Sequence, residues 1–419
     1  MAGTAKIAIL VVVLVIVAVV GYAAYAGYIP GIKSPSSTAS TAPNMSIVSS
    51  DDLNSTMGGG WNQVANFSFS STNFSFFLNA AMNLSSQSSL TSGASSLGSS
   101  ALADQTVGQV ESVELVDFYS SSGLIAAGYA HFKTNLSASN VFSALNLAIL
   151  ANASLKSNYS TGTLSGYNYF TLNATSGMPS LKIYTQMLVS NYGGEIIVIY
   201  HVSTTAISLS NSLSLLSKEF NILKTYGAKT NGAPLIVSRS TVNTDLGLNL
   251  NNSIKIGTYI NSPILLSKEL NFTANLTSGN VSVGQLNIST KSSMNVSLSP
   301  NMIQGAIYFR GGDSLFGAAI VKFNNNTDAA NIYTNVSNKI VAYEVTYGSM
   351  LSSHLHWDNA SGFVYFNYSY VNQTTGQTHY ADIGFGHAGS FVFVVAYLGT
   401  TYATNAQFAN LIQAQASLL

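Results

Sequence analysis

An uncharged apolar run near the N-terminus, residues 7–29, places the strongest constraint on this chain. At 1.5 Å per residue, a helix of this length measures about 35 Å, enough to cross a hydrocarbon layer of about 30 Å. Tyr22, Tyr25 and Tyr28 lie at its C-terminal end, where an aromatic belt would sit. The run predicts a single transmembrane anchor, preceded by a cytoplasmic N-terminus at residues 1–6.

Two other interpretations of this run remain open. It could be a cleaved signal peptide with its cleavage site at Ala24 to Ala26, although the run is longer than the usual signal core of about 7 to 15 residues. It could also be a pilin-type leader. No Lys-Gly or Arg-Gly pair precedes the run, however, and no Glu follows within its first turns.

The chain after the anchor has the features of an exported protein. Residues 30–44 are rich in Ser, Thr and Pro and predict an extended stalk. The sequon N-x-[S/T] occurs at twenty of forty Asn residues, whereas Ser/Thr abundance alone predicts about ten. An Asn-rich and Ser-rich surface could also create sequons by accident. The candidate glycosylation sites are Asn66, Asn73, Asn135, Asn173, Asn271, Asn275, Asn280, Asn287, Asn295, Asn335, Asn367 and Asn372.

Charged residues make up only 7% of the chain, and the formal net charge is zero. Soluble proteins usually carry about a quarter charged residues. The balance of charge gives no electrostatic footprint for nucleic acid or anionic lipid. The lack of cysteine excludes disulfides, thiolate metal sites and Cys nucleophiles.

Several segments of the body resemble one another in the same order, which predicts an internal duplication. The paired segments are 128–135 with 317–324, 165–173 with 361–369, and 193–204 with 388–400. A body of about 375 residues is also long for one core and suits two domains of about 185 residues. We place these extracellular repeats at residues 45–227 and 228–419.

Each repeat is expected to run strand, strand, helix, three strands, helix. The closing helices carry apolar stripes with helical spacing. We expect a two-layer α+β fold in which two helices cover one face of an antiparallel sheet. The stripes are Leu209, Leu213, Leu216 and Phe220 in the first repeat, and Phe408, Leu411, Ile412, Ala416 and Leu419 in the second.

The stretch 271–290 alternates apolar and polar residues as a strand does, and it contains no charge. A surface of amides, hydroxyls and sugars keeps the same charge in acid, whereas paired carboxylates are lost there. We therefore predict the outer face of an archaeal cell that lives in acid. A neutral envelope protein from a mild habitat is the alternative.

The string GDSL at residues 312–315 resembles the nucleophile block of the esterase family named after it. The resemblance covers four residues and implies Ser314 as a nucleophile. That family's block opens a helix after a strand and needs a late Asp-x-x-His, which this chain lacks. We therefore interpret the string as a hairpin turn.

The segment GFGHAG at residues 384–389 satisfies G-x-G-x-x-G, the dinucleotide fingerprint. That motif requires a helix after its glycines, to receive the pyrophosphate at its N-terminus. The next residues, SFVFVVAYL, have the pattern of a strand. We expect a hairpin turn and no nucleotide cofactor.

His354 and His356 share one side of an expected strand, a spacing that can give two imidazoles to a metal. A third ligand would have to come from Asp358, His379 or His387, and no second motif supports one. Asp51 and Asp52 are adjacent, so their carboxyls do not converge on one substrate. No catalytic, cofactor-binding or metal-ligating residue is assigned.

These observations favour a non-enzymatic, membrane-anchored cell-surface glycoprotein with a structural or adhesive role. Its expected partners are the bilayer through residues 7–29, N-linked glycans, and other envelope proteins or a second copy of itself. An anchored extracellular ligand-binding module is the first alternative. An extracellular hydrolase is the second, because distant Ser, His and Asp could still meet in the fold.

Overall fold

The computed structural model describes residues 47–71, 110–151, 158–178, 181–228, 233, 235–261, 301–310, 314–351, 354–358, 363–371 and 376–419. The expected anchor, the stalk and the uncharged stretch 271–290 lie outside these residues. Within them, we find no helix with the length and apolar character that a membrane crossing requires.

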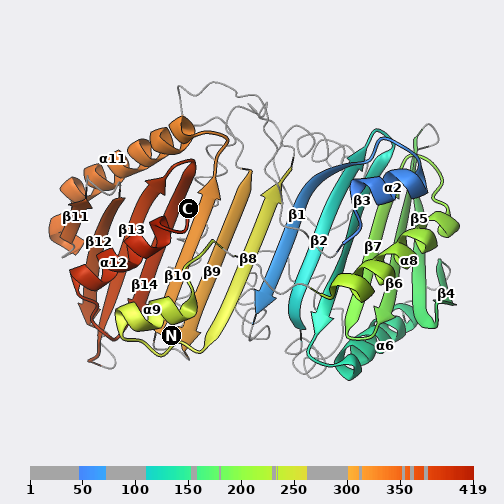
Figure 1. The fold of residues 1–419 in the computed structure, drawn as a ribbon, viewed down its shortest axis with the longest axis horizontal. Helices are drawn as coiled ribbons and strands as arrows, with labels where there is room; N and C mark the ends of the chain where they lie inside the picture. The colour runs from blue at the N-terminus through green and yellow to red at the C-terminus, as the bar shows by residue number, and fades with distance from the viewer. Residues whose placement is uncertain are drawn as a thin grey trace. The chain divides into compact units, whose positions relative to one another are not determined.

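The described residues form two compact units. The N-terminal unit comprises residues 47–228 with 259–261, and the C-terminal unit comprises residues 233–258 with 301–419. Each unit combines an antiparallel sheet with helices, so the α+β prediction is confirmed (Figure 1).

The N-terminal unit has a sheet with the strand order β1-β2-β3-β7-β6-β5-β4, and every neighbouring pair in it is antiparallel. In chain order its elements are α2 (Ser50–Met57), β1 (Asn62–Ser71), β2 (Val110–Ser120), β3 (Gly123–Phe132), α6 (Asn135–Ala151), β4 (Tyr159–Leu164), β5 (Tyr167–Met178), β6 (Leu181–Tyr192), β7 (Glu195–Ser203) and α8 (Leu209–Tyr226).

The C-terminal unit has the strand order β8-β9-β10-β14-β13-β12-β11. Its strands from β9 to β11 in this order pair antiparallel. In chain order its elements are α9 (Arg239–Leu246), β8 (Asn252–Ile260), β9 (Met302–Arg310), β10 (Ser314–Lys322), α11 (Asn326–Leu351), β11 (His354–Asp358), β12 (Phe363–Val371), β13 (Thr378–Ala388), β14 (Phe391–Gly399) and α12 (Asn405–Ala416).

The expected order of elements was one strand short. In both units four strands, not three, separate the two long helices, and a short helix and a strand precede the rest. The expected pairing of 128–135 with 317–324 is also shifted by two residues. Phe132 donates its backbone N–H to the carbonyl of Gly194, and Phe323 donates to that of Ser390, so Phe132 corresponds to Phe323.

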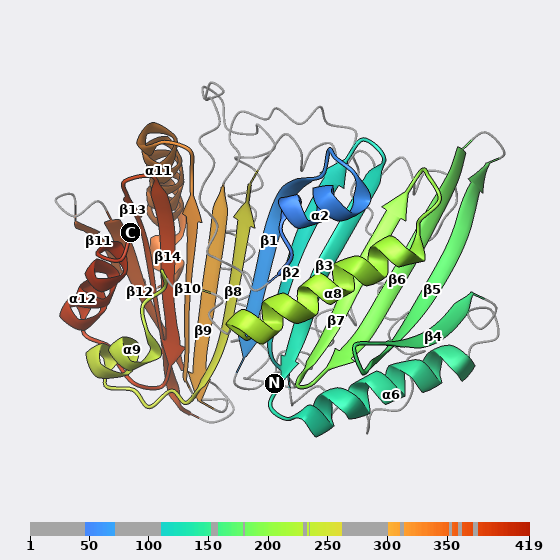
Figure 2. The same ribbon diagram turned by 45° about the vertical axis from the view of Figure 1, so that its right-hand side comes forward.

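The two long helices of the N-terminal unit lie on opposite faces of its sheet, contrary to the expected two-layer arrangement. Ile197 and Ile199 of β7 pack in one cluster with Leu215 and Leu216 of α8. Residues of α6 instead form a second cluster with Ile196 and, partly buried, Val198. Because neighbouring residues of a strand point to opposite faces, the sheet lies between α6 and α8. Figure 2 shows α8 crossing the strands.

The C-terminal unit has the same layering. Adjacent positions of β13 meet different helices: a Cβ on Gly384 would lie 2.5 Å from Ile412 of α12, whereas Phe385 stacks on Tyr333 of α11. All nine residues of β14 are buried. A strand covered on both faces must be apolar on both, which explains its unbroken run of apolar residues.

The stripes expected on the closing helices are partly confirmed. Phe408, Leu411 and Ile412 of α12 are buried. In α8, Leu216 and Phe220 are buried, but Leu209 is 37% exposed and the buried face continues through Leu215 and Leu223. The stripe of α8 is therefore rotated toward Leu215.

Candidate functional site

The described residues of the GDSL and GFGHAG strings lie in or beside strands of the C-terminal unit. Ser314 opens β10 and pairs with Arg310 of β9, so β9 and β10 are antiparallel neighbours on either side of the string. The turn expected between them, residues 311–313, lies outside the described residues. Gly384 and Gly386 lie inside β13, and only Gly389, with φ +54°, falls in the turn before β14. The strand that follows them is confirmed, but the expected turn holds one of the three glycines.

The first two candidate metal residues lie on one strand. His354 and His356 lie in β11, opposite Asn367 and Tyr365 of β12. Within the described part of the chain, no group of three His, Asp or Glu residues could hold a metal ion. Asp52 closes a capping box with Ser49 at the start of α2, which gives it a structural role.

The sequon asparagines differ in exposure. Asn135, Asn173 and Asn335 are exposed, and Asn367 is partly buried and donates to Asn405 Oδ1 over 2.8 Å. Asn66 in β1 is only 2% exposed, and Gln63 donates to its side-chain oxygen. The other candidates, Asn73, Asn271, Asn275, Asn280, Asn287, Asn295 and Asn372, lie outside the described residues.

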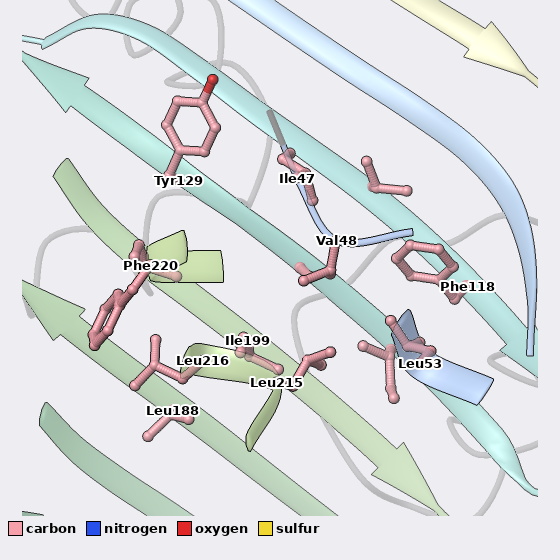
Figure 3. Packing of buried hydrophobic residues seen from close by; sticks show 14 of the residues in the cluster. Ile47, Val48, Leu53, Phe118, Tyr129, Leu188, Ile199, Leu215, Leu216 and Phe220 are labelled. Atoms are coloured by element: carbon pink, nitrogen blue, oxygen red, sulfur yellow. The ribbon is translucent and has the colours of Figure 1, made fainter. Parts of the chain in front are cut away.

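A short extended segment, residues 47–49, packs between α2 and α8 of the N-terminal unit; we call it the first strap. Ile47 and Val48 are buried with Leu53 of α2 and with Leu215 and Leu216 of α8. Figure 3 shows these side chains pointing toward one another above the sheet. Ser49 then caps α2 through the backbone N–H of Asp52.

A buried carboxyl joins the first strap to α8. The backbone N–H of Val48 donates to Glu219 Oε2 over 2.9 Å, and Glu219 is 1% exposed. Its Oε1 has no hydrogen-bond partner among the described residues. Burial, aided by the charge of Asp52, raises the pKa of Glu219 to about 8, against the lowering effect of the Val48 N–H.

The C-terminal unit has an equivalent second strap, residues 236–238, which precedes α9. Val237 donates its N–H to Gln415 Oε1 of α12 over 3.0 Å, and Gln415 Nε2 donates to the carbonyl of Leu235 over 2.8 Å. The hydroxyl of Tyr308 donates to the Val237 carbonyl over 2.8 Å. Gln415 thus occupies the place of Glu219.

A second polar group, with Gln186 and His201 buried and Asn173 exposed, lies on the same face of the N-terminal sheet as the first strap, across β5, β6 and β7. Asn173, Gln186 and His201 are direct neighbours on these strands. Gln186 donates to Asn173 Oδ1 over 2.9 Å, and the ring of Trp61 lies 5.5 Å from that of His201. Gln186 Oε1 and both ring nitrogens of His201 are buried without a partner among the described residues. Burial lowers the pKa of His201 to about 4.

Corresponding residues of the C-terminal unit are Asn367, Asp382 and Tyr397, again neighbours on three adjacent strands. Asp382 is 3% exposed, and its Oδ2 has no partner in the described structure. Burial raises the pKa of Asp382 to about 7. The Tyr397 hydroxyl donates to the carbonyl of Thr401 over 3.0 Å.

One ionic cluster lies at the turn between β6 and β7. His131 Nδ1 is 3.0 Å from Glu195 Oε1, and its Nε2 is 3.7 Å from Glu111 Oε2. The carboxylates bind opposite nitrogens of the ring, so the three groups do not converge on one point. The hydrogen bond with Glu195 and the charge of Glu111 raise the pKa of His131 despite its burial.

None of these described groups forms a nucleophile with an adjacent base and a third orienting group, as covalent catalysis requires. The arrangement holds polar side chains buried on the faces of the sheets. A bound polar ligand could supply the hydrogen bonds that these side chains lack.

Sequence reasoning missed the straps and their glutamate and glutamine. A signal was present: Ile-Val-Ser at residues 47–49 recurs at 236–238, and Asn54 recurs as Asn243 at the same spacing. Asn54 exchanges two hydrogen bonds with the backbone of Trp61, and Asn243 makes the same two with Leu250. The buried acids, in contrast, carry no local sequence signature.

Comparisons with known proteins give little for this chain. No protein-family model matches it, and no curated protein matches it by sequence. Among solved structures it is similar to the extracellular domain of PknH from Mycobacterium tuberculosis, with 10% identity over 42% of this chain and 93% of that one, at a TM-score of 0.25. It is also similar to TP0453, with 11% identity over 85% of this chain and 95% of that one, at a TM-score of 0.30. Similarity at these scores carries no argument about function.

Proposed function

We propose that this chain is a non-enzymatic, membrane-anchored glycoprotein of the cell surface, with a structural or adhesive role in an acid-living archaeon. Residues 7–29 would hold it in the bilayer, and the stalk would carry two extracellular modules. Other envelope proteins or a second copy of the chain are the proposed partners.

We further propose that the two modules arose by duplication. The shared order of elements, the two straps and the matched asparagines Asn54 and Asn243 support this proposal. A surface protein gains reach and a second contact face from a second module without needing an active site.

The acid habitat is supported by three carboxyls, of which Glu219 and Asp382 are buried and Asp117 is partly buried. Burial raises the pKa of Glu219 to about 8, of Asp382 to about 7 and of Asp117 to about 6. An acid whose folded pKa is raised by burial penalises folding once the pH exceeds its unfolded pKa, and this penalty is absent in acid. His201 and His387 act in the opposite direction, because burial lowers their pKa values.

Glycan mapping on the native protein from its host tests the proposed location. We expect sugar on the exposed Asn135, Asn173 and Asn335, and none on the buried Asn66, which serves as the matched control. Peptide mass spectrometry before and after removal of the glycans gives the occupancy of each site. Unmodified asparagine at all three exposed sites would contradict an exported glycoprotein.

Thermal unfolding from about pH 2 to pH 7 tests the proposed habitat. The three raised carboxyls predict that the melting temperature is maintained toward acid. A steep loss of stability below about pH 4 would argue for a mild habitat instead.

A ligand-binding module is the second candidate, and the buried polar neighbours favour it. Gln186, His201 and Asp382 each leave a buried polar atom without a partner in the described structure. A neutral polar ligand or water would satisfy these atoms. Density for a guest beside Gln186 and His201 in a crystal structure would support this function.

A further inference from the structure

Glu219 is placed where only a neutral side chain is well accommodated. Its carboxyl lies on the α8 face that packs against the first strap and α2, among Leu215, Leu216 and Phe220. Val48 supplies one N–H, at 2.9 Å, and no described cation approaches the carboxyl. An ionised carboxylate needs several donors or a cation when it is buried.

The C-terminal unit shows which neutral group suits this place. Gln415 accepts a hydrogen bond from the Val237 N–H of the second strap and donates one to the carbonyl of Leu235, which precedes the strap. A protonated carboxyl has the same shape as an amide, with one acceptor oxygen and one O–H donor. An ionised one has acceptors only and cannot reproduce the second bond.

We propose that Glu219 is an acid-closed latch: while it carries a proton it holds residues 47–57 against α8, and when it loses the proton it releases them. The strap is the part of the described chain that leads from the expected stalk into the N-terminal unit. Opening the latch would free the strap and α2 from α8 while leaving the sheet intact. This inference does not depend on where the protein is located.

The other titratable groups around the latch include Tyr167 and Tyr192 of the sheet, whose rings pack on Phe220, and Tyr169 of the same cluster. Asp52 of α2 adds a negative charge that favours the protonated form of Glu219. Lys218 of α8 bonds to Asp52 Oδ1 at 3.4 Å and to Ser55 at 2.6 Å, and the sheet contributes Tyr129 and its cross-strand neighbour Glu114. Hydrogen bonds from Ser49 and Lys218 lower the pKa of Asp52 although burial opposes them, so the Asp52–Lys218 pair weakens in acid. Its pH dependence is opposite to that of the latch.

Hydrogen exchange on the whole 419-residue chain tests the latch. Protection of residues 47–57, corrected for the intrinsic exchange rate, should fall at least about tenfold between pH 5 and pH 7.5, because each pH unit above the pKa of the open carboxyl favours opening about tenfold. Residues 236–246, held by Gln415, should keep their protection over the same range.

Two reciprocal variants give the matched controls. Glu219→Gln should abolish the fall in residues 47–57, and Gln415→Glu should create one in residues 236–246. Asp52→Asn should leave the fall in place. Equal protection at both pH values in the unmodified protein, or a fall of the same size in Glu219→Gln, would overturn the proposal. Absence of glycans would refute the proposed location and leave this result unaffected.

Discussion

The two units hold the same geometry with different chemistry. In the N-terminal unit the strap is fixed by a buried acid, Glu219, whereas the C-terminal unit uses the amide of Gln415 and the hydroxyl of Tyr308. At the second buried position the assignment is reversed: the N-terminal unit has the neutral Gln186, and the C-terminal unit has Asp382. Each unit therefore keeps one buried acid at one of two corresponding places. Burial raises the pKa of the acid at both places, so the folded state favours its protonated form.

The largest expected effect concerns another matched pair, Leu188 and Gly384. Leu188 is paired with Ile199, as Gly384 is with Val395, and Leu188 is 1% exposed in the core under α8. Leu188→Ala should lower the free energy of unfolding by about 2–5 kcal/mol, because it leaves a cavity there. Denaturant unfolding measures the loss, and hydrogen exchange should place it in the N-terminal unit.

Gly384→Ala is the matched substitution in the C-terminal unit. It adds a methyl group at the position that corresponds to Leu188, where the first variant removes side-chain atoms. The new Cβ would lie 2.5 Å from Ile412 Cδ1 and 3.1 Å from Val395 Cγ2. Crowding of this kind costs about 1–3 kcal/mol. If Leu188→Ala were neutral and Gly384→Ala stabilising, the two helices would not pack on their sheets as the structure shows.

Asp382 gives the next largest effect, and it depends on pH. Its folded pKa, about 7, exceeds the ordinary value of 3.8, so the folded state is penalised as the pH rises above 3.8 and fully penalised above 7. We compare the free energy of unfolding of Asp382→Asn with that of the unmodified protein at each pH. This difference should shift in favour of the variant by about 2–4 kcal/mol between pH 3 and pH 8. Chemical denaturation at the two pH values measures this difference.

The reciprocal substitution Gln186→Glu sharpens the same comparison. It places an acid at the corresponding position of the N-terminal unit, where Gln186 is 3% exposed, and should introduce a similar penalty above neutral pH. An Asp382→Asn variant whose stability followed the same pH curve as the unmodified protein would show that Asp382 ionises freely.

The sequence predicted the α+β class and most strands, because alternation in segments such as β2 is a local property. It did not predict that the long helices lie on opposite faces. The apolar runs of β7 and β14 indicated it, because a strand covered on one face alone has polar residues on its other face. Runs that are apolar at successive positions therefore predict cover on both faces. The buried acids could not be predicted, because Glu219 in an amphipathic helix has the same local pattern as a solvated glutamate. Its partner in the fold, the strap, comes from a distant part of the chain.

The smallest expected effect comes from the turn where the units replace an ion pair by a cation–π contact. His131 bonds to Glu195 at 3.0 Å, whereas the corresponding Lys322 Nζ lies 5.5 Å from the ring centroid of Phe391. The raised pKa of His131 means that its pair stabilises the fold below pH 6.5 and stops doing so as the pH rises through the folded pKa. Glu195→Gln should therefore lower the unfolding free energy by less than about 1 kcal/mol at pH 5.5 and leave it unchanged at pH 8, because the pair is partly exposed.

An NMR titration of the ring should show the pKa of His131 falling in Glu195→Gln, and falling less in Glu111→Gln, whose oxygen is 3.7 Å away. An unaltered titration in Glu195→Gln would mean that His131 and Glu195 do not pair in solution. The ion pair would then no longer distinguish the N-terminal unit from the C-terminal unit.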